Sequence, residues 1–305
     1  MVGAFLFLIP MVPYATFRAT EPESRPVMPW IPAPVVTFPF HPPGSAGDSD
    51  GRDIGGRTSP FSARAVRETS RGWEWKGLET PGWKILMAPH FVVRGDVPID
   101  RLRTVGAHLE EFLKAIQDLL GGDISDIMFS ARVFSDSHEF RRYAVRSGAP
   151  NAESFYDPRS AELVICLAGS PSAAWLQKTL AHEFAHEYMD RVWKRTDPLW
   201  FAEGLAEYFS NFAVRDGRMV PGALDGRALL LLRLEELGPL TRFLKLDRGE
   251  MYGVTFARHY AQAWSFVHYL FSRKDETIDL LLRGESLKNV EELEKGWLEY
   301  LKKLE

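Results

Sequence analysis

The longest regular pattern of apolar residues runs from Ile99 to Leu120, where they recur every three or four positions. That spacing places them on one face of a helix, and Gly121-Gly122 supplies a helix stop. Shorter segments rich in β-branched and aromatic residues lie before and after it, and these predict strands. We expect strands over residues 83–87, 90–94 and 127–134, a short helix over 137–145, and a hairpin that pairs 152–156 with 162–167.

The second half of the chain carries helical rather than strand patterns. A helix is expected from residue 173, and after Phe209 the chain is expected to be helical throughout. The apolar stripes there predict helices over residues 228–237, 256–271 and 290–304. The predicted fold class is therefore α+β, a small mixed sheet with helices followed by a mainly helical subdomain. We expect one folded domain over 73–305, with an α/β half at 73–193 and a helical half at 194–305.

Residues 1–19 form an apolar N-terminal segment, and 20–72 are rich in proline and glycine. The apolar run is too short for an ordinary membrane span of ~20 residues, but it has the length of the apolar region of a secretory signal. The second segment is expected to be an extended linker. We therefore expect an exported or envelope-associated protein, with membrane association through the first segment. No Lys or Arg precedes the apolar run, so an incidental apolar terminus on a cytoplasmic protein stays open as the alternative.

The composition narrows the class of protein. Hydrophobic residues make up 45% of the chain and charged residues 26%, as in soluble globular domains. The formal net charge of -4 argues against a nucleic-acid partner, because proteins that bind nucleic acid present a basic face. The single cysteine excludes an internal disulfide.

The candidate chemistry concentrates in one helical stretch, which contains His182-Glu183-Phe-Ala-His186. Residues four apart lie on one face of a helix, so the two imidazoles can converge on a single Zn²⁺. Glu183 lies one step around the helix, where it can accept a proton from a metal-activated water. Two core histidines beside a solvated glutamate would give the same spacing, and for this motif alone that alternative stays open.

A second helical stretch supplies a third ligand, since catalytic zinc sites usually have three ligands from the protein. Asp197-Pro198 predicts a helix start, with Asp197 as the N-cap and Pro198 at the first helical position. A short turn precedes this helix, so the two helices should pack antiparallel. With a rise of ~1.5 Å per residue, Glu203 then lies level with the histidines and is predicted to bind the metal. Glu207 lies one turn further on and is predicted to hydrogen-bond a ligand histidine and fix its tautomer.

Two other kinds of zinc site do not fit the chain. The long motif H-E-x-x-H-x-x-G-x-x-H requires glycine and histidine where this chain has Met189 and Val192. A cysteine-containing site needs a ligand cysteine, but Cys166 lies in an apolar run that predicts a buried strand. His90 has no partner at ligand spacing and is expected to be a structural residue of its strand.

Together, the two helical stretches resemble the gluzincin metallopeptidases, and most closely their peptidase-MA-like group of bacterial proteins. The residues that carry the resemblance are His182-Glu183-x-x-His186 and Trp200-x-x-Glu203-Gly204-x-Ala206-Glu207-Tyr208. The resemblance extends over residues 73–305 and is specific in its central part. It implies a zincin-like fold with one zinc ion per chain on the two histidines and Glu203, and Glu183 as the general base.

The same resemblance implies two further roles. Gluzincins use a downstream tyrosine to stabilise the oxyanion, and Tyr260 lies in the similar segment, with His259 and Tyr252 as rival donors. The first strand of the predicted hairpin, between Ala152 and Tyr156, corresponds to the sheet edge beside the cleft, where a peptide can add as a further strand. A core tyrosine and an ordinary hairpin are the alternatives.

The expected function is hydrolysis of a peptide bond by metal-activated water, with a peptide or protein as the substrate. The alternative is a domain that binds zinc without cleaving peptides and acts as a binding or scaffold module of the cell envelope. The presence of Glu183 argues against that alternative, because a binding module needs metal ligands but no base.

Overall fold

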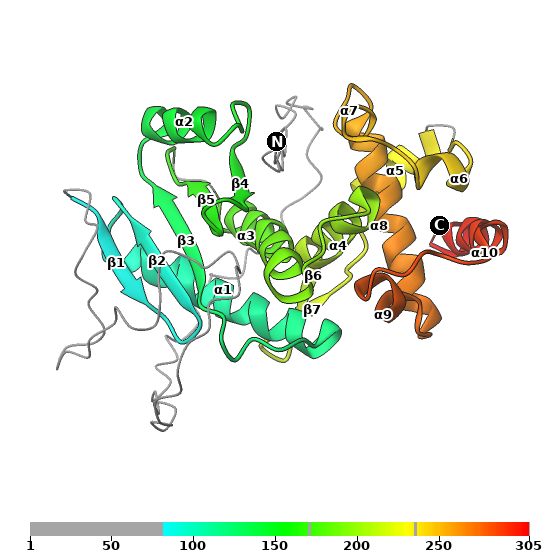
Figure 1. Cartoon of the computed structure of the whole chain (residues 1–305), viewed down its shortest axis with the longest axis horizontal. Helices are drawn as coiled ribbons and strands as arrows, with labels where there is room; N and C mark the ends of the chain where they lie inside the picture. The colour runs from blue at the N-terminus through cyan, green and yellow to red at the C-terminus, as the bar shows by residue number, and fades with distance from the viewer. Residues whose placement is uncertain (1–81, 170–171, 235–236, 305) are drawn as a thin grey trace, which may run out of the picture.

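The computed structural model of the chain describes residues 82–169, 172–234 and 237–304. Within these residues the protein is an α+β fold, as the sequence predicts: a small mixed sheet with helices, followed by a mainly helical half (Figure 1). The predicted N-terminal segment at 1–19 and linker at 20–72 lie outside the described residues, and so does the expected domain start at residue 73.

Five strands form the sheet. They are β1 (Lys84–Met87), β2 (Phe91–Gly95), β3 (Phe129–Phe134), β4 (Ser154–Asp157) and β5 (Glu162–Cys166). Their order is β1-β2-β3-β5-β4; the three central strands run parallel and the two outer strands pair antiparallel. The strand expected from Ala152 begins instead at Ser154, and it is an edge strand as predicted.

Helices cover both faces of the sheet. α1 (Ile99–Leu120) and α3 (Ala173–Tyr188) contribute to the core on one face, and α2 (Ser137–Arg146) packs on the other (Figure 1). The alternation of side chains along β5 serves both cores, since Leu163 and Ile165 join the first and Val164 joins the second. α3 therefore lies against the sheet, where its side chains can meet those of β4.

Local signals set the ends of these helices. The apolar stripe of α1 is buried, and the chain leaves the helix at Gly121, which has a positive φ of 61°. The side chain of Asp136 caps α2 by accepting two backbone N–H bonds. Ser172 caps α3 by accepting the N–H of Trp175, so it fixes the start of the helix that carries both histidines.

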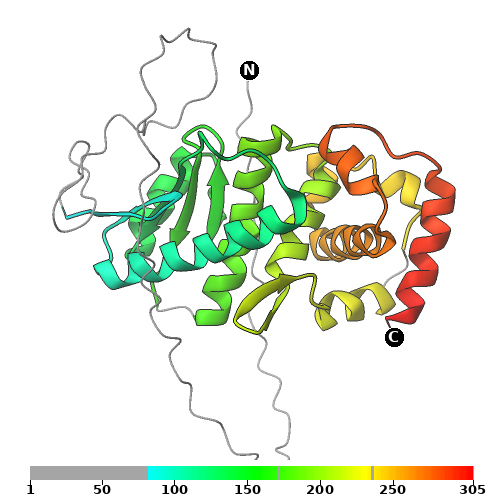
Figure 2. The ribbon, with the colours of Figure 1, turned by 90° about the horizontal axis from the view of Figure 1, so that it is seen from below.

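A π-helical turn, Met189–Trp193, leads from α3 to α4 (Leu199–Ser210) and the helical half. The remaining helices are α5 (Gly226–Leu234), α6 (Leu240–Phe243), α7 (Arg248–Met251), α8 (Phe256–Arg273), α9 (Thr277–Leu282) and α10 (Val290–Lys303). α8 is seen end-on in Figure 2, with α4, α5, α9 and α10 around it. Among the helices described, none combines the length and the apolar character that a membrane span requires.

The expectation of an all-helical chain after Phe209 is wrong. β6 (Phe212–Arg215) and β7 (Arg218–Pro221) form a separate two-stranded sheet directly after α4. Asp216 and Gly217 connect them with φ values of 51° and 70°, the conformation of a two-residue hairpin turn. The Asp-Gly dipeptide is the local signal for this hairpin, but its strands are short and half exposed, so they show no clear apolar alternation.

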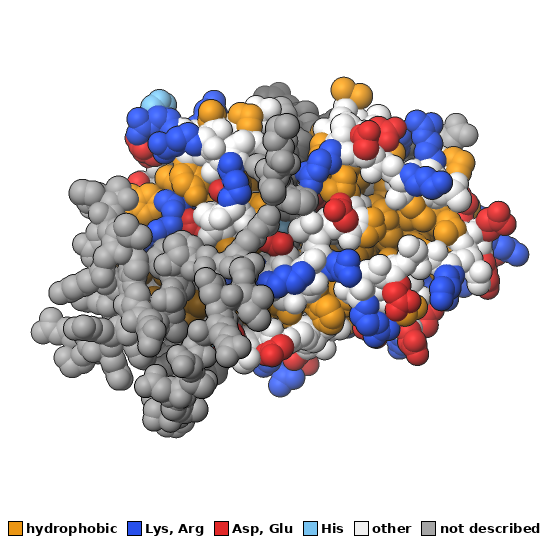
Figure 3. All heavy atoms as spheres, in the orientation of Figure 1, with side chains coloured by type: hydrophobic (Ala, Val, Ile, Leu, Met, Phe, Trp, Pro, Cys, Tyr) orange, Lys and Arg blue, Asp and Glu red, His pale blue; other side chains and the backbone are white. Residues whose placement is uncertain are grey.

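On the face seen in Figure 3, basic and acidic side chains are interspersed over the described surface. Apolar side chains gather over the helical half on the same face. The exposed large apolar residues of that half include Leu230, Leu234 and Leu298.

Candidate metal centre

Two histidines of α3, one helical turn apart, direct their side chains towards the same point. The Nε2 atoms of His182 and His186 lie 3.2 Å apart, and their exposed fractions are 1% and 2%. The spacing of four residues thus brings both imidazoles together, as a helix requires.

α4 brings Glu203 to the same point. Its Oε2 lies 3.6 Å from Nε2 of His182 and 3.6 Å from Nε2 of His186. In the part of the chain that the structure describes, these three side chains form the one group of His, Cys, Asp or Glu residues whose ligand atoms lie close enough to share a metal ion.

Gly204 allows α4 to approach α8 closely. A Cβ at this position would lie 2.5 Å from Cγ2 of Val267 and 2.6 Å from the carbonyl oxygen of Ala263. Both distances are shorter than a nonbonded contact, so only glycine fits without a shift of the helices. Gly204, next to Glu203, therefore sets the distance between α4 and α8, the helix that carries Tyr260.

The start of α4 differs from the prediction. The N-cap position is Pro198 rather than Asp197, and Pro198 has an extended ψ of 150°. The carbonyl of Pro198 accepts the N–H groups of Phe201 and Ala202, while no side chain caps the helix. The shift of one residue does not move Glu203 off the face that meets the histidines.

The donor set fits a zinc ion. Oε2 of Glu203 is buried and accepts no hydrogen bond within the described residues, although it lies beside two imidazole nitrogens. Ligand atoms that are ~2.0–2.1 Å from a tetrahedral ion lie ~3.3 Å from one another. The three observed separations, 3.2, 3.6 and 3.6 Å, are close to that value. The buried cluster can therefore hold a metal ion, and its geometry alone does not identify which one.

The charges of the three side chains are linked. Burial opposes ionisation of Glu203, but the adjacent His186 and His182 outweigh it and hold the pKa of the carboxyl well below its usual range. Burial also lowers the pKa of His186. For His182 burial is outweighed by Glu203 and Glu207, which raise the pKa to about 10. Histidine binds a metal ion as the neutral imidazole, so metal binding at this cluster is expected to depend on pH.

Glu207 contacts the far side of the His182 ring. Its Oε1 lies 3.1 Å from Nδ1 of His182 as an ion pair, next to the ring that it is predicted to orient, but the geometry of the predicted hydrogen bond is not met among the described residues. Lys178 lies beside Glu207, with Nζ 4.0 Å from Oε2 of Glu207 and 3.5 Å from Oδ2 of Asp225. The contact between Glu207 and Nδ1 of His182 favours the ring orientation in which Nε2 of His182 faces Glu203.

Tyr252 holds Glu203 from the other side. Its hydroxyl donates to Oε1 of Glu203 over 2.8 Å, and burial together with this carboxylate raises the pKa of the phenol. Sequence reasoning treats Tyr252 only as a remote candidate for the oxyanion donor. The contact could not be predicted, because Tyr252 follows the short helix α7 and meets Glu203 only through tertiary packing.

Of the other two candidates for the oxyanion donor, Tyr260 lies next to the cluster and His259 does not. The ring of Tyr260 is parallel to that of His182, with planes at 6° and centroids 6.3 Å apart. Burial, followed by the charge of Glu203, raises the pKa of Tyr260, so the phenol stays neutral. His259 lies around the helix, where it lines a separate cavity of about 770 Å³ between α6, α7 and the start of α8.

Glu183 lies beside the cluster, and the sheet holds it. Its Oε1 accepts the hydroxyl of Ser154 and its Oε2 accepts the backbone N–H of Tyr156, each over 3.0 Å. Both donors belong to the edge strand β4. Burial raises the pKa of Glu183 to about 7, against the opposing effect of His182. Sequence analysis missed Ser154, because nothing local connects a strand serine with a helix residue 29 positions away.

Residues 176–289 match the profile of a family described as a protein of unknown function, DUF1570. The matched segment runs from α3 to the residue before α10, so it contains the three cluster residues, Glu183 and both tyrosines. Among curated proteins, no match to the chain is found. The match therefore covers the cluster of His182, His186 and Glu203 and most of the helical half, whereas the five-stranded sheet lies before it.

The other two residues weighed as metal ligands lie elsewhere. Nδ1 of His90 pairs with Oε2 of Glu110 at 2.8 Å, and the backbone N–H of His90 binds the same carboxylate. Cys166 is a free thiol at the end of β5. Neither belongs to the cluster, as the sequence predicts.

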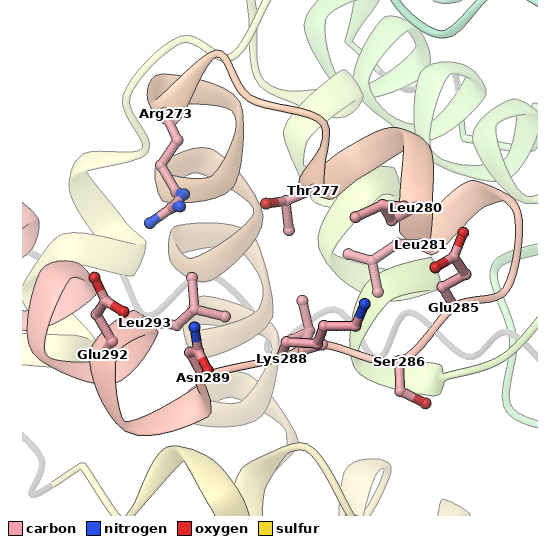
Figure 4. Close-up of a pocket in the computed structure, with 11 residues that line it drawn as sticks. Arg273, Thr277, Leu280, Leu281, Glu285, Ser286, Lys288, Asn289, Glu292 and Leu293 are labelled. Atoms are coloured by element: carbon pink, nitrogen blue, oxygen red, sulfur yellow. The ribbon is translucent and has the colours of Figure 1, made fainter.

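A smaller cavity of about 190 Å³ lies between the end of α8, α9 and the start of α10 (Figure 4). Its charged lining residues are Arg273, Lys288, Glu285 and Glu292, so basic and acidic groups balance. No cluster residue lines this cavity, and its lining includes neither histidine nor cysteine.

Proposed function

We propose that this chain is a zinc-dependent metallopeptidase of the gluzincin type. The observation that carries the proposal is Glu183, a buried carboxylate beside the cluster that is not one of its three convergent ligands. A site that only binds zinc needs ligands, whereas hydrolysis also needs a group that moves a proton. The resemblance of the two helical motifs to gluzincins supports the same assignment.

Each residue has a distinct role in the proposed reaction. His182, His186 and Glu203 would hold the metal, since a catalytic zinc site has three protein ligands and an open position for water or substrate. A bound zinc ion would lower the pKa of water at that position towards ~7 and polarise the scissile carbonyl. Glu183 accepts a proton as the water oxygen attacks the carbonyl carbon, and it gives that proton to the amine as the C–N bond breaks.

Tyr260 is proposed as the donor to the oxyanion that forms on the carbonyl oxygen. Its place beside His182 and its raised pKa support this role, because a neutral phenol can donate a hydrogen bond to developing charge. Donors of this kind contribute ~3–4 kcal/mol to transition-state stabilisation in well-studied enzymes.

The proposed substrate is a peptide or protein segment in extended conformation. β4 is the edge strand of the sheet, and two of its residues touch Glu183. An extended peptide that added to this edge would pass next to the base. The position of the edge strand thus supports a polypeptide substrate over a small molecule.

The test compares cleavage of a peptide library by the wild type, by the wild type with a chelator, by the chelated protein after zinc is restored, and by Glu183→Gln. Glutamine keeps the shape of Glu183 but cannot accept the proton. We expect Glu183→Gln to keep its zinc and to cleave 10²-fold more slowly or worse, the loss expected for a general base. The chelated protein should lose cleavage and recover it with zinc.

Two results would count against the proposal. Equal rates for Glu183→Gln and the wild type would remove Glu183 from the reaction. A wild type that binds zinc but cleaves none of the library would favour the second candidate, a zinc-binding module without peptidase activity.

A further inference from the structure

The carboxylate of Glu183 is held by donors that sequence motifs do not reveal. We propose that Ser154 is a positioning residue for Glu183, an inference that rests on the peptidase function proposed above. The hydroxyl of Ser154 donates to Oε1 of Glu183 over 3.0 Å, and the two residues expose 1% and 0% of their surface. A buried carboxylate needs such donors, because water does not solvate it.

One strand supplies both donors to Glu183. Ser154 and Tyr156 are two residues apart in β4, and each binds a different oxygen of the carboxylate. Two donors on two oxygens fix the plane of the carboxylate. Each oxygen can still accept one more hydrogen bond, so the group keeps its capacity to take a proton from water.

β4 makes a second contact, with the helical segment that follows α3. The hydroxyl of Tyr156 donates to Oδ2 of Asp190 over 2.7 Å, in the π-helical turn that follows α3. β4 thus contacts α3 at Glu183 and the turn after α3 at Asp190. The two contacts hold Ser154 at a constant place relative to the base.

Removal of the Ser154 hydroxyl leaves Glu183 with the Tyr156 N–H as its remaining donor from β4. The carboxylate can then rotate, and it spends less time in the orientation that accepts the proton. We expect kcat of Ser154→Ala to fall about tenfold, a part of the 10²-fold or more that a general base supplies. KM and zinc content should change little, because the hydroxyl of Ser154 binds Glu183, which is not one of the three convergent residues.

The chain offers a matched control in Ser130 of β3. Ser130 is equally buried, and its hydroxyl donates to Oε1 of Glu162 over 3.2 Å. Glu162 is a buried carboxylate paired with Arg94 and Arg132, and it is not in the cluster. Ser130→Ala therefore removes the same kind of hydrogen bond from the same sheet without touching the proposed base.

The experiment uses the full chain loaded with zinc. It measures kcat, KM, zinc content and the urea midpoint of unfolding for the wild type, Ser154→Ala, Ser154→Thr and Ser130→Ala. Both alanine variants should unfold at lower urea, but only Ser154→Ala should lose kcat. Ser154→Thr keeps the hydroxyl and should recover most of the lost kcat.

The outcomes separate the two proposals. Equal kcat for Ser154→Ala and the wild type, in a protein that Glu183→Gln inactivates, overturns the role of Ser154 alone. A wild type without peptidase activity overturns the proposed function, and the catalytic role of Ser154 with it. The contact itself is tested without activity: Ser154→Ala should lower the urea midpoint in the wild type but not in a Glu183→Ala background. An equal shift in both backgrounds overturns the contact.

Discussion

At the scale of single residues, the two oxygens of Glu203 have different partners. Oε1 accepts the hydroxyl of Tyr252, while Oε2 lies 3.6 Å from each ligand histidine. Because one oxygen is tied to a phenol, rotation of the carboxylate is restricted and the other oxygen stays directed at the imidazoles. Tyr252 therefore contacts Glu203 directly, whereas Tyr260 is the residue proposed to donate to the oxyanion.

The two tyrosines can be separated by the same substitution. Tyr252→Phe removes the donor that orients Glu203 and should weaken zinc binding about 10-fold to 100-fold, as for other residues that orient a ligand. Tyr260→Phe should lower kcat with little change in KM, because the hydrogen bond proposed between Tyr260 and the oxyanion forms in the transition state. Competition with a chelator measures the first effect and peptide kinetics the second. The reverse pattern would exchange the two roles.

That His182, His186 and Glu203 converge on one point could be predicted from sequence, because local geometry determines where they lie. A spacing of four on α3 joins His182 and His186, and a short connection to α4 limits where Glu203 can reach. Ser154 and Tyr252 could not be predicted, because each reaches the site from a distant segment. The role proposed for Tyr260 rests on resemblance, and the structure adds its place beside His182.

At the scale of elements, the contact with α8 positions α4, the helix that carries Glu203. Gly204→Ala would place a methyl group 2.5 Å from Val267 and 2.6 Å from the Ala263 carbonyl, so the two helices must separate. We expect a loss of about 1–3 kcal/mol in the free energy of unfolding, typical of an overpacked core. Gly226→Ala is the control, since a Cβ there would have no atom within 4 Å apart from its chain neighbours and the backbone of its own helix. Equal urea midpoints for the two variants would contradict the tight contact.

The elements themselves were predicted to different degrees. α1 forms over its predicted range because many apolar residues share one helical period. The hairpin of β6 and β7 was missed, because half-exposed strands carry little apolar pattern even where Asp216-Gly217 marks the turn. The prediction that Pro198 is the first helical residue of α4 is wrong, because Pro198 has an extended backbone and occupies the N-cap position.

At the scale of the whole molecule, the five-stranded sheet and the three cluster residues that the structure describes lie between residues 82 and 304. A chain that lacks residues 1–72 should therefore fold and bind one zinc ion. Its helix content by circular dichroism and its urea midpoint should match those of the full chain. A truncated chain that is unfolded or free of metal would show that the first 72 residues complete the fold.

The central claim, that His182, His186 and Glu203 form a zinc site, is tested most directly by the metal content of the purified full chain. We expect one zinc ion per chain, by elemental mass spectrometry, in the wild type and in Glu183→Gln. His182→Ala and Glu203→Ala should lose the metal, because each removes one of three ligands. Zinc at one ion per chain in these two ligand variants, or a wild type that takes up no zinc, would contradict the account.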